Sequence, residues 1–74
     1  MPIRIEISDH AAERLRQRGI TRELIRRCLA TGVLSGLDVS GRLVRELRVR
    51  RRHLTVVYIE VKGGALVITA YWKG

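Results

Sequence analysis

Three side chains near the start of the chain have types and spacing suited to chemistry on RNA: His10, Arg14 and Arg18. Residues four apart in a helix advance by about 400°, so these side chains would lie along one face. RNA cleavage by its own 2′-hydroxyl needs a base, an acid and cations that stabilise the charge growing on phosphorus. One imidazole and two guanidiniums could supply much of this chemistry. A structural role for His10, as a hydrogen-bonding residue at a helix start, is the alternative that the spacing leaves open.

A second set of arginines could bind a nucleic-acid backbone without taking part in catalysis. The chain has 15 Lys and Arg residues against 7 Asp and Glu, which gives a formal net charge of +8 at pH 7. Most of them are arginines, whose planar guanidinium can donate two parallel hydrogen bonds to a phosphate. This charge favours a polyanionic partner such as RNA, although each arginine could also simply be a solvated surface residue. The candidate nucleic-acid contacts are Arg22, Arg26, Arg48, Arg50, Arg51 and Arg52.

Aromatic residues and potential metal ligands are scarce. Tyr58, Tyr71 and Trp72 are the only aromatic residues, which does not favour a base-stacking platform. The single cysteine, Cys28, cannot close an intramolecular disulfide, and we expect it to be a buried thiol. The histidines and acidic residues show no metal-ligand spacing, so we expect no metal and no cofactor. Because no apolar run approaches the length of a signal peptide core or a membrane span, we expect a soluble, cytoplasmic protein.

Hydrophobic periodicity predicts one strand, two helices and then four strands. Apolar residues alternate with charged ones over 3–7, which is typical of a half-buried strand. Ser8 or Asp9 can cap a helix over 10–18, and Thr21 can cap a second helix that ends at Gly32. The remaining chain alternates between apolar segments and turn residues. These segments predict strands over 33–38, 42–51, 53–61 and 65–72.

The predicted elements fit one α+β domain that spans residues 1–74. Two helices pack on a mainly antiparallel sheet of four to five strands, in the order β-α-α-β-β-β-β. The last two strands are apolar on both faces, so we expect them at the centre of the sheet. Because two short helices cover about one face, the other face would be left for a partner or for a second copy in a homodimer.

Two segments resemble a small bacterial family catalogued as domain of unknown function 4258. The first segment reads His10-Ala11-x-Glu13-Arg14-Leu15-x-x-Arg18-Gly19-Ile20, and the second reads Val67-Ile68-Thr69-x-Tyr71. That family is similar to the RelE/ParE-like toxins and related ribonuclease folds. The resemblance implies two helices on an antiparallel sheet, with active residues on the first helix and the late strands.

The same resemblance implies a metal-independent endoribonuclease of the toxin type. His10 would act as base or acid, Arg14 and Arg18 would stabilise the phosphorane, and Thr69 would orient the phosphate. Tyr71 and Tyr58 would be proton donors or base-stacking residues, and the expected protein partner is an acidic antitoxin. Two other functions remain open on the residues alone. One is a non-catalytic nucleic-acid-binding or regulatory module, and the other is a protein-interaction domain.

Overall fold

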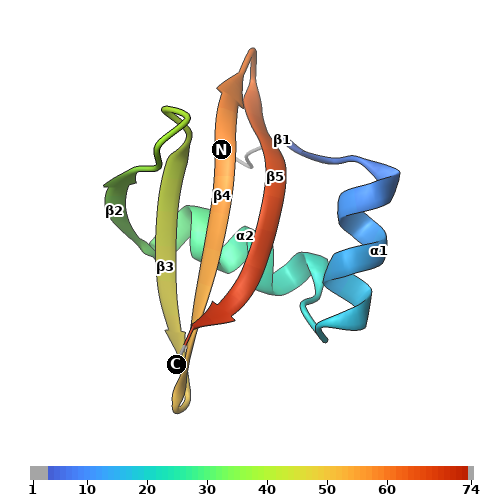
Figure 1. Ribbon diagram of the computed structural model, residues 1–74, viewed down its shortest axis with the longest axis vertical. Coiled ribbons are helices and arrows are strands. Elements are labelled where there is room, and N and C mark those ends of the chain that lie inside the picture. The colour runs from blue at the N-terminus through green and yellow to red at the C-terminus, as the bar shows by residue number, and fades with distance from the viewer. Residues whose placement is uncertain (1–3, 74) are drawn as a thin grey trace.

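The computed structural model describes residues 4–73, which form two helices and five strands (Figure 1). The predicted order β-α-α-β-β-β-β is confirmed. Most element ends differ from the predicted ones by one or two residues, and Ile3 lies outside the described residues. The elements are β1 (Arg4–Ile7), α1 (Asp9–Gln17), α2 (Arg22–Thr31), β2 (Val33–Leu37), β3 (Leu43–Val49), β4 (Arg52–Val61) and β5 (Gly64–Lys73).

Side-chain caps and one glycine fix the ends of the helices. The Ser8 hydroxyl accepts a hydrogen bond from the N–H of Ala11, so Ser8 rather than Asp9 caps α1. Thr21 caps α2, as predicted. A Cβ atom at Gly32 would lie 2.4 Å from the carbonyl oxygen of Cys28, so only glycine lets the chain leave α2 in this direction.

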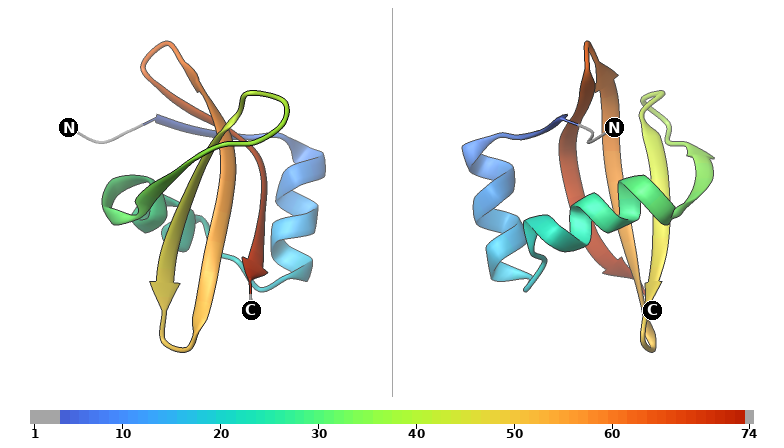
Figure 2. Two further views of the ribbon diagram at one scale, coloured as in Figure 1. Left: turned by 60° about the vertical axis from the view of Figure 1, so that its left-hand side comes forward. Right: turned by 180° about the vertical axis from the view of Figure 1, so that it is seen from behind.

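The strands form one mixed sheet in the order β1-β5-β4-β3-β2. Only β1 and β5 pair in parallel, and the three other pairs are antiparallel. The prediction that β4 and β5 lie inside the sheet is therefore confirmed. The helix α2 crosses the back of the sheet against β3 and β4, and α1 runs beside β5 (Figure 2). The sheet face opposite α2 is called the open face below.

A β-bulge in β5 decides which of its side chains meet the helices. Val57 pairs with Thr69 but the next residue, Tyr58, pairs with Val67, so Ile68 is an extra residue. Val67 and Ala70 are both buried and belong to the hydrophobic core, although three positions separate them. Beyond the bulge, Ala70 and Trp72 therefore face the helices. Thr69 and Tyr71 lie on the open face.

The sequence predicted an exposed apolar surface on the open face, but most of it lies at the edge of the sheet. On the open face, Thr55 and Val57 are only 1% and 6% exposed, because flanking side chains enclose the middle of β4. Ile59 and Tyr71 are exposed on the open face, but most of the large exposed apolar side chains lie on β2 and the loop that follows, at the edge of the sheet. They are Val33, Leu34, Leu37 and Val39.

Candidate functional site

The side chains of His10 and Arg14 form a contact pair on the exposed surface of α1. The Nε of Arg14 donates a hydrogen bond to Nε2 of His10 at 3.0 Å. An imidazole that accepts at Nε2 is neutral and carries its proton on Nδ1. Because Ser8 already caps the helix, His10 is not needed to satisfy the helix start. The pair places a neutral imidazole beside a permanent cation.

Arg18 connects the end of α1 to β5. Its guanidinium Nη1 donates to the carbonyl oxygen of Ala70 at 2.7 Å and lies 3.4 Å from the Thr69 hydroxyl. The carbonyl of Arg18 in turn accepts from the indole N–H of Trp72 at 2.8 Å. Since β1 pairs with β5 only as far as Val67, Arg18 covers the part of the β5 edge that β1 leaves. The Arg18 guanidinium thus stabilises the edge of β5 through the Ala70 carbonyl and also lies next to the Thr69 hydroxyl.

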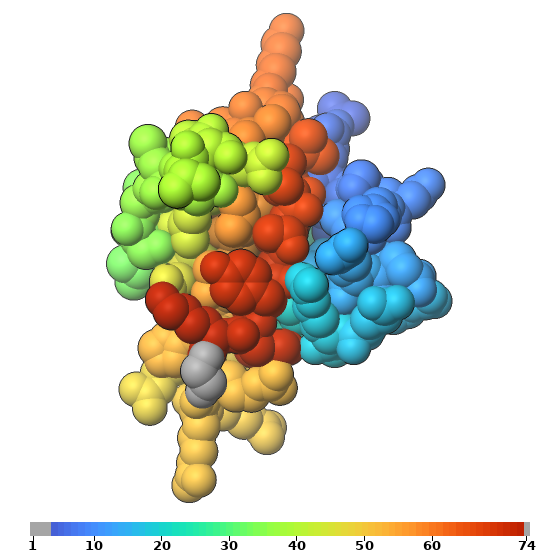
Figure 3. Space-filling view, viewed as in Figure 1, coloured from blue at the N-terminus to red at the C-terminus, as the bar shows by residue number. Residues whose placement is uncertain are grey.

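The open face carries the remaining residues of the predicted catalytic group. Thr69 is half-buried, and Tyr71, two residues further along the same face, is 41% exposed. Figure 3 shows β5 exposed on this face, between α1 and the chain that follows β2. Arg18 and Thr69 are therefore brought together, with Tyr71 beside them, while His10 and Arg14 form a pair one to two turns earlier on α1.

Tyr58, the other tyrosine considered for the site, belongs to the core. It is 5% exposed, and its hydroxyl accepts a hydrogen bond from Arg45 Nε at 2.8 Å. Arg45 also donates from Nη1 to the carbonyl of Gly32 at 2.9 Å, so it ties β3 both to β4 and to the end of α2. This hydroxyl lies on the helix side of the sheet, away from Thr69 and Tyr71.

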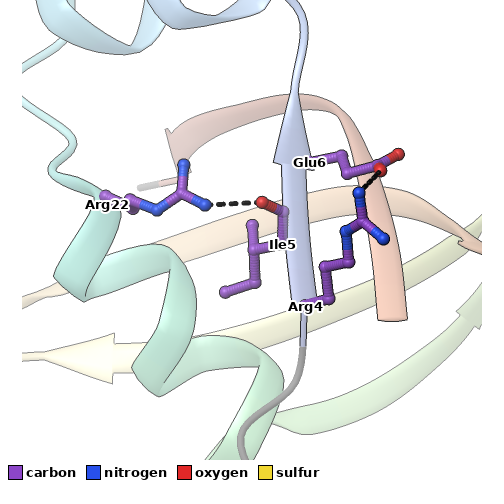
Figure 4. Close-up of polar contacts among 4 residues, drawn as sticks. All are labelled: Arg4, Ile5, Glu6 and Arg22. Atoms are coloured by element: carbon purple, nitrogen blue, oxygen red, sulfur yellow. Dashed lines mark hydrogen bonds and ion pairs between the residues drawn. The ribbon is translucent and has the colours of Figure 1, made fainter. Parts of the chain in front are cut away.

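Arg22 makes a structural contact similar to that of Arg18. Its Nη2 donates to the carbonyl of Ile5 at 2.5 Å, which fastens the start of α2 to the edge strand β1 (Figure 4). On the opposite side of β1, Arg4 and Glu6 form an exposed ion pair at 3.3 Å. Arg26, the other candidate on α2, is exposed.

Strand alternation puts Arg48 on a different face of the sheet from Arg52, so the arginines of the predicted corner are divided. Arg48 lies on the open face opposite His53, whereas Arg52 points to the other face, with its guanidinium carbon 4.0 Å from the centre of the Trp72 ring. Arg50 and Arg51 form the turn between β3 and β4. Arg50 has a φ of 60°, the left-handed region that favours glycine.

A groove of about 440 Å³ lies beside this turn. Trp72, the aromatic residue in its wall, was not among the predicted site residues. The predicted hairpin of β4 and β5 could have indicated this contact. Its register places Leu54 opposite Trp72, so Arg52, two residues before Leu54, lies diagonally across from the indole. The groove is lined by Val49, Arg50, Arg51, Arg52 and Trp72.

Cys28 is fully buried on α2, as expected. Burial, partly offset by the nearby cation Arg45, raises the pKa of the thiol to about 11. The group therefore remains a thiol at neutral pH and is a poor nucleophile. Within residues 4–73, no three His, Cys, Asp or Glu side chains gather in a group that could hold a metal ion. No helix in the same range is long and apolar enough to cross a membrane.

Comparison with known proteins gives one match. No curated protein and no solved structure matches the chain significantly. The model of one family, described as Domain of unknown function (DUF4258), matches residues 7–72. That range includes the His10–Arg14 pair, the Arg18–Thr69 contact and the groove beside the β3–β4 turn. The chain belongs to this family, as the two quoted segments predicted.

Proposed function

We propose that this protein is a metal-independent endoribonuclease of the RelE/ParE-like toxin type. A single contact supports this function best: the exposed His10 imidazole accepts a hydrogen bond from Arg14 at Nε2, the atom that would take a proton from RNA. A neutral imidazole beside a guanidinium combines a base with a phosphate-binding cation. The net charge of +8 would attract the RNA.

The reaction needs two proton transfers and one exchange of bonds at phosphorus. The ribose 2′-hydroxyl replaces the Arg14 N–H at His10 Nε2 and gives its proton to the imidazole. The 2′-oxygen then bonds to phosphorus while the bond to the 5′-oxygen breaks, and the leaving oxygen takes up a proton. The products are a 2′,3′-cyclic phosphate and a free 5′-hydroxyl.

The other side chains have supporting roles. Arg14, released from the imidazole, donates to a non-bridging phosphate oxygen, and Arg18 adds a second positive charge near Thr69. The Thr69 hydroxyl orients the phosphate. Tyr71 is the tyrosine whose side chain reaches solvent on this face, so it is our candidate for the proton donor to the leaving oxygen.

Matched variants test the two central residues. Purified protein is incubated with end-labelled RNA and a metal chelator, with and without ribosomes, and the fragment ends are analysed. His10→Ala should reduce cleavage by about 100-fold or more, whereas His53→Ala, which alters the only other histidine, should not. Arg14→Ala should also lose activity. Arg16→Ala on the same helix should not, because Arg16 pairs with Glu13.

Two results would contradict the assignment. Cleavage that persists in folded His10→Ala protein would remove His10 from the reaction. Fragments with 3′-phosphate but no cyclic intermediate at any time point would exclude attack by the 2′-oxygen.

A non-catalytic nucleic-acid-binding or regulatory module is the second candidate function. It is favoured by the exposed arginines at the β3–β4 turn, which lie away from the His10–Arg14 pair. In this case the protein would retard RNA in a salt-dependent way and leave it intact with and without ribosomes. The His10→Ala variant would then behave like the wild type.

A toxin of this kind acts on RNA in the cytoplasm and is expected to have an acidic antitoxin. The exposed apolar side chains of the edge strand β2 suit an added strand from such a partner, and the net positive charge suits its acidic residues. A second copy could use the same edge. Sedimentation of the purified protein at two concentrations detects self-association, and an acidic protein that co-purifies with it would indicate the antitoxin.

A further inference from the structure

The groove beside the β3–β4 turn combines an aromatic ring, a stacked cation and two further arginines. The guanidinium of Arg52 lies over the Trp72 ring, 4.0 Å from its centre. Arg50 and Arg51, both exposed, form another wall. A groove of about 440 Å³ is large enough to take a nucleobase with part of its sugar.

The Trp72 ring is held in place before any ligand arrives. Its indole N–H donates to the carbonyl of Arg18 at 2.8 Å, and the ring packs against the edge of the hydrophobic core. The ring in turn supports the Arg52 guanidinium. A planar group fixed in this way can accept a second planar group at a small entropic cost.

We infer that this groove is a nucleobase-binding subsite for single-stranded nucleic acid. A base stacks on the free side of the Arg52 guanidinium, which Trp72 supports from the other side, and Arg50 and Arg51 contact the adjoining phosphates. Guanidinium planes are stacking surfaces for unpaired bases, whereas a Lys ammonium is not. The subsite is therefore specific for a planar ligand as well as for negative charge.

The groove lies on the helix side of the sheet, whereas Thr69 and Tyr71 of the proposed catalytic site lie on the open face. The hydrogen bond from Trp72 to Arg18 joins the groove to the residue that contacts Thr69. The choice of RNA as the natural ligand rests on the proposed function. The subsite itself requires only that a single-stranded nucleic acid binds in the groove, and it does not require cleavage.

Trp72 is the only tryptophan, so its fluorescence reports on this groove alone. The probe is an eight-nucleotide oligodeoxythymidylate, which lacks the 2′-hydroxyl and cannot be cleaved by the proposed reaction. We expect it to change the Trp72 emission, because a base enters the groove. Inorganic polyphosphate of the same charge should bind with little change in emission. Equal changes with both probes would mean that the groove senses charge only, and would overturn the inference.

A pair of conservative variants tests stacking separately from charge. Arg52→Lys keeps the charge but loses the planar surface, and it should weaken oligonucleotide binding by about fivefold or more. Arg27→Lys, the same change at an exposed position on α2, should have less than about a twofold effect. Unchanged binding by the Arg52→Lys variant would refute the subsite. Absence of RNA cleavage would refute the proposed function and leave these binding results unaffected.

Discussion

Two groups of arginines in this protein make different contacts, and composition does not distinguish them. Arg18, Arg22 and Arg45, called the inward arginines here, each donate to a backbone carbonyl of another element. Arg50 and Arg51, the tip arginines, form an exposed hairpin turn, and their side chains make no hydrogen bond or ion pair with any of residues 4–73. The inward arginines replace missing backbone hydrogen bonds at sheet edges and at a helix end. The tip arginines leave their guanidiniums available for a ligand.

This difference has an energetic basis. A hydrogen bond from a charged group to a partly buried acceptor contributes about 1.5–3 kcal/mol, and its loss leaves the carbonyl unsatisfied. An exposed charge at a turn contributes within about 0.5 kcal/mol to folding. The same substitution should therefore lower stability in one group and binding in the other.

Arg45 should give the largest effect on stability. Arg45→Ala removes hydrogen bonds to the Tyr58 hydroxyl and the Gly32 carbonyl, and should lower the free energy of unfolding by about 2–4 kcal/mol. Urea denaturation followed by circular dichroism measures the change. Arg48→Ala, three residues along β3, is the control: it removes only an exposed hydrogen bond to the Arg50 carbonyl and should unfold almost like the wild type. Equal midpoints for both variants would contradict the division into two groups.

Arg18 should give the next largest effect. Arg18→Met keeps much of the side-chain volume but removes the donor to the Ala70 carbonyl, and we expect a loss of about 1–2 kcal/mol. Hydrogen exchange should show that the amides of β5 beyond the bulge open more easily. Arg51→Met should leave both measurements unchanged, and a loss of similar size there would be evidence against the comparison.

The tip arginines should affect ligand binding instead. The double variant Arg50→Gln/Arg51→Gln should keep its stability to within about 0.5 kcal/mol. The slope of log K for oligonucleotide binding against log salt should become shallower by about 1.4, since each lost phosphate contact on a single strand changes it by about 0.7. The measurement is a fluorescence titration at four salt concentrations. An unchanged slope would show that these residues do not contact phosphates.

The smallest effect should be a gain in stability at the turn. Arg50 has a φ of 60°, which costs an L-residue more than it costs glycine, so Arg50→Gly should stabilise the protein by about 0.5 kcal/mol. Thermal unfolding can detect this gain. Arg51→Gly is the control, because Arg51 has no positive φ and glycine there should give no gain.

The sequence predicted the fold well because each element depends on local patterns. Alternating apolar residues, the cap at Thr21 and the glycine at Gly32 act over a few residues, and all three are confirmed. The parallel pairing of β1 with β5 was not specified, because it depends on contacts between distant segments.

The site was harder to predict, because residue type does not show what a side chain contacts. Arg18 and Thr69 were both named as site residues, but the bond from Arg18 to the Ala70 carbonyl depends on where β1 stops pairing with β5. Trp72 was not named as a site residue, because its contact with Arg52 depends on the register between two strands. Catalysis by His10 stays a prediction.

The bulge in β5 has a consequence for changes in chain length. Ile68 is one residue more than β4 needs opposite it. Its deletion would leave Thr69 on the open face and Ala70 on the helix side, while removing the local bend that a bulge adds to a strand. A deletion elsewhere in β5 would shift the following residues by one position, so their side chains would change from one face of the sheet to the other. Deletion of Ile68 would therefore change the direction of β5 without changing which of its other side chains belong to the core.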